Sequence, residues 1–66
     1  MRHETAQMGE SQLLELRNMS VLLEEARVAT RDLAYHRRVR LEDVLGRALD
    51  EVDRQIEELR REEGRG

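Results

Sequence analysis

The chain has 66 residues, of which 41% are charged and none is cysteine, and its formal net charge is −3. This length allows one small domain, and the lack of cysteine excludes disulfides and thiolate metal sites. The negative charge gives no overall attraction to nucleic acid or to anionic membranes. Because so small a domain needs an additional source of stability, we expect a partner, either a second copy of the chain or another protein.

Targeting and membrane segments are not visible in the sequence. No window approaches the roughly 18 consecutive apolar residues of a membrane-spanning helix. The first residues, MRHETAQMGES, lack the apolar core of a signal peptide. We therefore expect a soluble cytoplasmic protein with no membrane partner.

Both ends of the chain are predicted to be flexible. Residues 1–10 include Gly9 and few apolar side chains, which predicts a flexible N-terminal segment. Residues 63–66 are predicted to form a flexible tail, with Gly64 as the stop of the last helix. Residues 11–62 then make up the folded domain.

Two amphipathic stretches fill this domain. In the first, side chains recur in steps of three and four, the spacing of one helical face, at Leu16, Met19, Leu23, Ala26, Thr30 and Leu33. The second has the same spacing at Leu45, Leu49, Val52, Ile56 and Leu59. Leu22 and Ala29 widen the first stripe, and Leu41, Val44 and Ala48 widen the second. Both stretches are predicted to be helices, the first with Ser11 as its N-cap.

Opposite charges four residues apart support the second helix. An acidic residue precedes an arginine in the favourable order three times, at Asp43 and Arg47, Asp50 and Arg54, and Glu57 and Arg61. Each such pair stabilises an exposed helical face by about 0.2–0.5 kcal/mol.

The segment AYHRRVR, residues 34–40, is predicted to contain a turn. Written as heptads, the first stretch has its a positions at 16, 23 and 30 and the second at 49 and 56, and one straight helix does not join these frames. The sequence therefore predicts an all-α antiparallel two-helix hairpin, with helices at about 11–36 and 41–62. We expect it to complete a bundle by dimerisation.

The charges on both sides of the proposed turn favour the same fold. Arg37, Arg38 and Arg40 suit the negative C-terminal end of a first helix. Glu42 and Asp43 suit the positive first turn of a second helix.

One long continuous coiled-coil helix is the alternative fold. The turn segment contains no Gly, Pro, Asn or Ser, the residues that usually form turns. Gly46 lies inside the second stretch and costs about 1 kcal/mol relative to Ala. It either permits a close helix approach or marks a bend.

The apolar stripes are wider than two helices can bury against each other, so they also predict an interface. The residues expected to act as core and interface together are Leu16, Met19, Leu23, Leu33, Leu45, Leu49, Val52, Ile56 and Leu59. They predict a small protein–protein interaction module, such as an adaptor, a small chaperone or co-chaperone, or a regulator. Its partner is a second copy, in a homodimer, or a helix of another protein. A purely structural coiled coil is a further alternative.

A basic cluster provides an alternative function. His36, Arg37, Arg38 and Arg40 are candidate anion contacts, and they would suit a nucleic-acid-binding or antitoxin-like regulator. The acidic flanks, the negative net charge and the lone aromatic residue, Tyr35, argue against nucleic acid as the partner.

No catalytic constellation is visible. Adjacent carboxylates such as Glu24 and Glu25 point about 100° apart on a helix, so they do not share a site. Neither a nucleophile beside a base nor a phosphate-binding Gly loop is present, and Leu33 stands where the Glu-x-x-His motif of di-iron bundles requires Glu before His36. We expect no enzymatic activity, no cofactor, no metal and no small-molecule substrate.

Residues 48–62, ALDEVDRQIEELRRE, resemble the opening helix of the helical chorismate mutases. The similarity covers this one stretch, whose residues are common formers of amphipathic helices. We carry over no active-site residue from that family.

Overall fold

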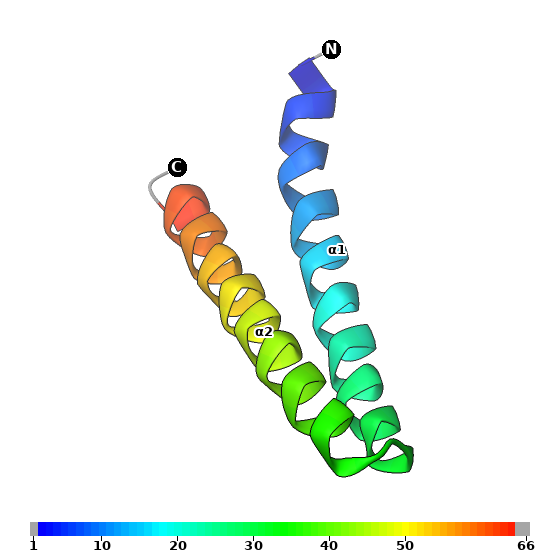
Figure 1. Ribbon diagram of the computed structural model, residues 1–66. Coiled ribbons are helices and arrows are strands. Elements are labelled where there is room, and N and C mark those ends of the chain that lie inside the picture. Colours follow the sequence, from blue (N-terminus) through cyan, green and yellow to red (C-terminus); the bar gives the residue numbers. More distant parts are fainter. Residues whose placement is uncertain (1, 65–66) are drawn as a thin grey trace.

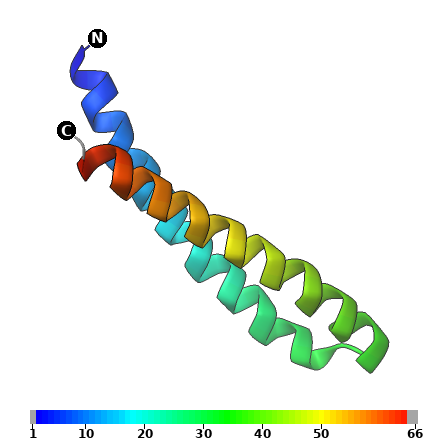
Figure 2. The ribbon, with the colours of Figure 1, turned by 90° about the vertical axis from the view of Figure 1, so that its left-hand side faces the viewer.

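The computed structural model describes the backbone of residues 2–64 and the side chains of residues 10–62. Helix α1 spans Arg2–Ala29, the 3-10 helix η1 spans Thr30–Asp32, and helix α2 spans Tyr35–Gly64. The two long helices run antiparallel and are joined at one end (Figures 1 and 2); they pack closely near this connection and diverge toward the open end, as Figure 1 shows. The predicted all-α two-helix hairpin is confirmed, and the alternative of one continuous helix is wrong.

The bounds of the helices differ from the predicted ones. Helix α1 ends at Ala29 instead of about residue 36, and α2 begins at Tyr35 instead of about residue 41. Helix α1 also begins at Arg2, ahead of Ser11, the predicted N-cap. The predicted flexibility of residues 1–10 and 63–66 stays a prediction, because it falls almost entirely outside the residues whose side chains are described.

Thr30 explains why the turn comes earlier than predicted. Its hydroxyl donates a hydrogen bond to the Arg27 carbonyl at 2.6 Å, and such local bonds give the backbone an alternative to continued helix. The Leu33 N–H then donates to the Thr30 carbonyl at 3.0 Å, which closes the 3-10 turn. Leu33 itself is extended, with φ −96° and ψ 159°.

The turn needs no glycine because its backbone conformation is open to any residue. No residue in the described part of the chain has a positive φ. Ala34 alone separates the extended Leu33 from α2, and the Ala34 carbonyl accepts hydrogen bonds from the N–H groups of Arg37 and Arg38 at 3.0 and 2.9 Å. The segment AYHRRVR therefore leads into α2 and forms its first turns. It lacks Gly, Pro, Asn and Ser because it is mostly helical, and their absence did not indicate one continuous helix.

The arginines consequently lie at the opposite helix end from the predicted one. Arg37, Arg38 and Arg40 are in the first turns of α2, at the positive end of the helix dipole, where a cation is disfavoured by about 0.3–1 kcal/mol. The prediction that they stabilise the end of the first helix is wrong. Arg38 is half-buried and lies over the Tyr35 ring, with its guanidinium carbon 5.6 Å from the ring centre.

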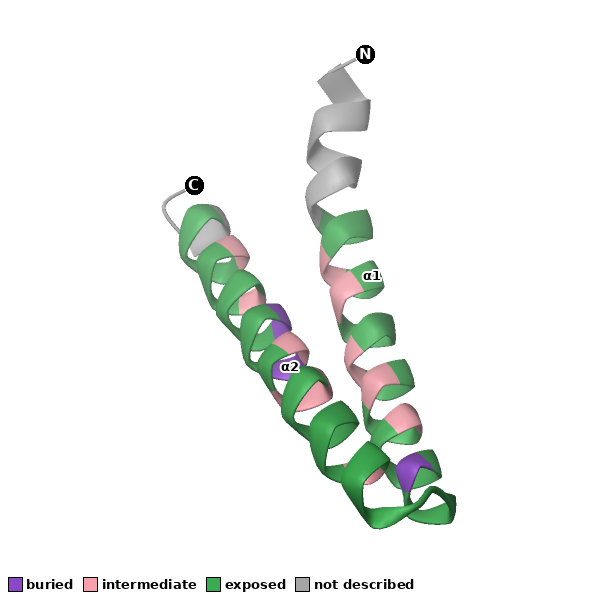
Figure 3. Cartoon of the chain, viewed as in Figure 1, coloured by how far each residue is buried: buried purple, intermediate pink, exposed green. Residues whose placement is uncertain are grey.

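The core is a narrow strip along the facing edges of the two helices (Figure 3). Leu49 and Val52, 7% and 5% exposed, are its buried apolar side chains among the described residues. Half-buried side chains extend the strip on both helices, at Leu13, Leu16, Ser20, Leu23, Ala26, Leu45, Ala48, Ile56 and Leu59. Full burial of one Leu or Val contributes roughly 1.5–3 kcal/mol, so two such residues make a small core.

Candidate interaction surface

The strip of contact between the helices separates two sides of the hairpin with different chemistry. Successive helical residues are about 100° apart, so neighbours of the contact residues fall on one side or the other. On α1, Ala26 and Ala29 lie on one side of the line through Leu23 and Thr30, and Glu24 and Arg27 lie on the other. Helix α2 divides in the same way. One side of the hairpin is therefore apolar and the other is charged.

The apolar side contains a groove near the closed end of the hairpin. One hollow of about 410 Å³ is lined by Ala26, Ala29, Thr30, Leu33, Leu41 and Leu45. A second of about 520 Å³ is lined by Leu33, Arg37, Arg40, Leu41 and Val44. Because the two hollows share Leu33 and Leu41, we treat them as one surface and call these residues together the apolar groove.

Large side chains around this groove are open to solvent. Leu22 is 62% exposed, Val44 58%, Met19 46% and Leu33 40%. Met19 and Leu22 belong to the groove side because each lies seven residues, or two helical turns, before a groove residue, Ala26 and Ala29 respectively. Single exposed apolar residues are ordinary, but a cluster of them marks an interaction surface.

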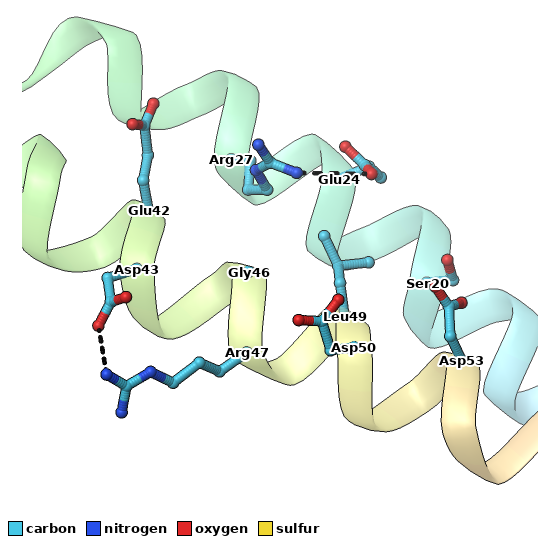
Figure 4. A pocket seen from close by; sticks show the side chains of 10 residues that line it. All are labelled: Ser20, Glu24, Arg27, Glu42, Asp43, Gly46, Arg47, Leu49, Asp50 and Asp53. Carbon is cyan, nitrogen blue, oxygen red and sulfur yellow. Dashed lines mark ion pairs between the residues drawn. The ribbon is translucent and has the colours of Figure 1, made fainter.

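The opposite side is an acidic groove of about 430 Å³, shown in Figure 4. It is lined by Ser20, Glu24, Arg27, Glu42, Asp43, Gly46, Arg47, Leu49, Asp50 and Asp53. Arg47 pairs with Asp43 at 3.2 Å, as predicted, and Arg27 lies 3.8 Å from Glu24. Leu49 reaches in between the helices, with these charged groups around it (Figure 4). Exposed pairs of this kind contribute at most about 1 kcal/mol each, and their charged groups remain accessible to water.

The open end of the hairpin is acidic and polar. A hollow of about 530 Å³ there is lined by Ser11, Gln12, Glu15, Leu16, Gln55, Glu58, Leu59 and Glu62. It contains the half-buried Leu16 and Leu59, which belong to the predicted interface residues.

Arg54 organises the carboxylates at this end of α2. It contacts Glu51 at 2.5 Å and also pairs with Glu58, whereas the sequence predicts Asp50 as its partner. The Gln55 amide donates a further hydrogen bond to Glu51 at 2.8 Å. Hydrogen bonds from Arg54 and Gln55 lower the pKa of Glu51 from 4.5 to about 2, and the Glu51 hydrogen bond raises the pKa of Arg54.

The basic cluster does not form one anion site. His36, Arg37, Arg38 and Arg40 are close in sequence but point in different directions around the start of α2. Arg37 and Arg40 border the apolar groove, while Arg38 stacks on Tyr35 near α1. The cluster therefore supplies two cations to the edge of the apolar groove and no shared anion cradle.

The predicted core and interface residues divide into three groups. Leu49 and Val52 are buried, whereas Leu16, Leu23, Leu45, Ile56 and Leu59 are half-buried. Met19 and Leu33 are exposed on the apolar side. Thr30 was predicted as a stripe position, but its role in ending α1 was not recognised.

No group of three or more His, Asp and Glu side chains within residues 10–62 could hold a metal ion. No helix among the described residues is both long and apolar enough to cross a membrane. Comparisons of the chain with protein-family models, curated proteins and solved structures find no match. The surface of the hairpin is therefore the basis for inferring its function.

Proposed function

We propose that this chain is a non-enzymatic protein–protein interaction module whose apolar groove receives side chains of a partner helix. The supporting observation is that large apolar side chains gather on one side of the hairpin, around Leu33, Leu41 and Val44. Water contact with these side chains is unfavourable, and a partner that covers them gains the corresponding free energy. An adaptor, a small chaperone and a regulator all act in this way.

The shape of the groove suits a helix better than a small ligand. The hollow of about 410 Å³ is lined by Ala26 and Ala29 of α1 and by Leu41 and Leu45 of α2, so it lies between the two helices, and the second hollow continues it along α2. A third helix packs into a groove between two helices through apolar residues spaced three and four apart. Arg37 and Arg40 at the border would fix the register of that helix through its carboxylates.

The proposal is tested by photo-crosslinking in cells that make the chain. A photoreactive amino acid replaces Val44 in one variant and Leu14 in the other, both exposed apolar residues on different faces. We expect a covalent protein adduct from position 44 and none from position 14, with the attached protein identified by mass spectrometry. Adding Leu41→Glu should abolish the adduct. Equal labelling from both positions, or none from position 44, would contradict the proposal.

A further inference from the structure

The exposed area of the hairpin exceeds that of a self-sufficient monomer. The chain exposes 5651 Å², whereas a folded monomeric protein of its mass exposes about 4,400 Å². The excess, about 1,300 Å², is more than the roughly 800 Å² that each partner buries in a standard interface. The elongated hairpin therefore leaves more surface uncovered than a compact monomer of its mass does.

A second stripe runs along each helix on the apolar side. On α2 it follows steps of four and three through Arg37, Leu41, Val44, Ala48, Glu51, Gln55, Glu58 and Glu62. On α1 it follows Glu15, Met19, Leu22, Ala26 and Ala29, and Leu33 of the connection lies at the same end of the groove. These stripes lie beside the contact strip: Ala26 and Ala48 are half-buried at its edge, and the other residues of both stripes are exposed. Their seven-residue spacing is that of a helix–helix seam.

The second stripe changes character along its length. It is basic at the closed end, with Arg37 and neighbouring Arg40, and apolar in the middle. Beyond Ala48 it becomes acidic, at Glu51, Glu58 and Glu62, and α1 contributes Glu15 at the same end. If a second copy lies antiparallel on this surface, the basic part of each stripe faces the acidic part of the other.

We infer that the apolar groove binds a second copy of this chain, antiparallel and related by a two-fold axis near Val44. This inference rests on the proposed function and names its partner. With the axis at Val44, α2 packs on α2 of the second copy, and Leu41 lies beside its Ala48. Arg37 lies opposite Glu51 of the second copy. The pair forms a four-helix bundle with the apolar segments inside.

The charges select the antiparallel arrangement over the parallel one. A parallel pair would place Arg37 beside Arg37 and Glu51 beside Glu51, and like charges at an interface are unfavourable. The antiparallel pair replaces both repulsions with attractions. The opposite, acidic face of each hairpin remains in water, because five carboxylates against two arginines would repel a second copy there.

The location of the interface is tested by sedimentation equilibrium with a matched pair of variants. Val44 and Val21 are 58% and 56% exposed, but Val21 lies on the side of α1 away from α2. We expect the parent chain and Val21→Glu to form dimers of twice 7.8 kDa. Val44→Glu should weaken the dimer by more than ~100-fold, because two carboxylates then meet in an apolar seam. Circular dichroism checks that each variant stays helical.

The orientation is tested with single cysteines, which are unique labels because the chain has none. Val44→Cys should form an intermolecular disulfide under mild oxidation. Arg37→Cys should not form one with itself but should do so when mixed with Glu51→Cys. Self-crosslinking of Arg37→Cys as fast as that of Val44→Cys would overturn the antiparallel arrangement.

Two further results would overturn the inference. A dimer that tolerates Val44→Glu would place the interface elsewhere. A monomer at every concentration would exclude the second copy as the occupant. If the chain is monomeric but position 44 crosslinks to another protein, the dimer is excluded and the proposed function stands. If position 44 gives no crosslink at all, the proposed function is contradicted as well.

Discussion

The two sides of the hairpin differ in what they require from their surroundings, although the same two helices form both. The acidic groove holds charged groups that water solvates well, and its ion pairs are exposed. The apolar groove exposes Leu33, Leu41 and Val44, which water solvates poorly. The contrast teaches that two helices can form one well-hydrated side and one side where a groove is lined by exposed apolar residues, and we expect a partner on the latter side.

Replacement of Leu49 should have the largest effect on stability, because Leu49 is one of the two buried apolar side chains among the described residues. Leu49 is 7% exposed and also forms the floor of the acidic groove. Leu49→Ala should lower the free energy of unfolding by about 2–4 kcal/mol. Urea unfolding of both chains at one fixed concentration measures this difference in the free energy of unfolding. Leu14→Ala, on an exposed Leu, should change the stability by less than about 0.5 kcal/mol. Equal losses in the two variants would show that Leu49 is not core.

Loss of the Thr30 hydroxyl should weaken the closed end, where the apolar side begins. Thr30 is 4% exposed and its hydroxyl binds the Arg27 carbonyl at 2.6 Å. Thr30→Val keeps the branched shape but not the hydrogen bond, so it should cost about 0.5–1.5 kcal/mol. The same unfolding measurement tests this, with Thr30→Ser as the variant that keeps the hydroxyl. A Thr30→Val chain as stable as the parent would contradict the account of the turn.

A methyl group added on the acidic side should stabilise the hairpin and leave its association unchanged. A Cβ at Gly46 would have no atom within 4 Å, so it meets open space. Neither interpretation of Gly46 from the sequence is therefore confirmed: it makes no close helix contact, and α2 continues through it. Gly46→Ala should raise the free energy of unfolding by about 0.5–1 kcal/mol. A loss of stability would mean that another group occupies this groove.

Acid should produce the smallest effect, at the open end of α2. The pKa of Glu51 is lowered from 4.5 to about 2 by its hydrogen bonds to Arg54 and Gln55. Because the pKa of Glu51 is lower in the folded chain than in the unfolded chain, its ionised carboxylate stabilises the fold above about pH 4.5. This contribution is lost as the pH falls toward 2. Glu51 is exposed and water screens its charge, so the change should be slight. Between about pH 4.5 and 2, the helicity measured by circular dichroism should fall less in Glu51→Gln than in the parent chain. Identical curves of helicity against pH would contradict this prediction.

The fold was predictable from the spacing of apolar residues, because that spacing directly reports helical faces. The bounds were not, since the turn depends on one hydrogen bond from Thr30, which looks like any other stripe position. The residues that widen the stripes, such as Leu22 and Val44, contained the signal for the apolar groove. The division into an apolar and an acidic side became visible only when both helices were placed together, because each side combines residues from α1 and α2.

The most direct test of the central claim compares the accessibility of the two sides in solution. Val44→Cys and Val21→Cys place a thiol at nearly equally exposed positions, on the apolar side and on a face away from α2. Alkylation rates are measured under reducing conditions over a range of chain concentrations. The proposed dimer predicts that position 44 becomes progressively protected as the concentration rises, while position 21 reacts at a constant rate. Equal rates at every concentration would contradict it.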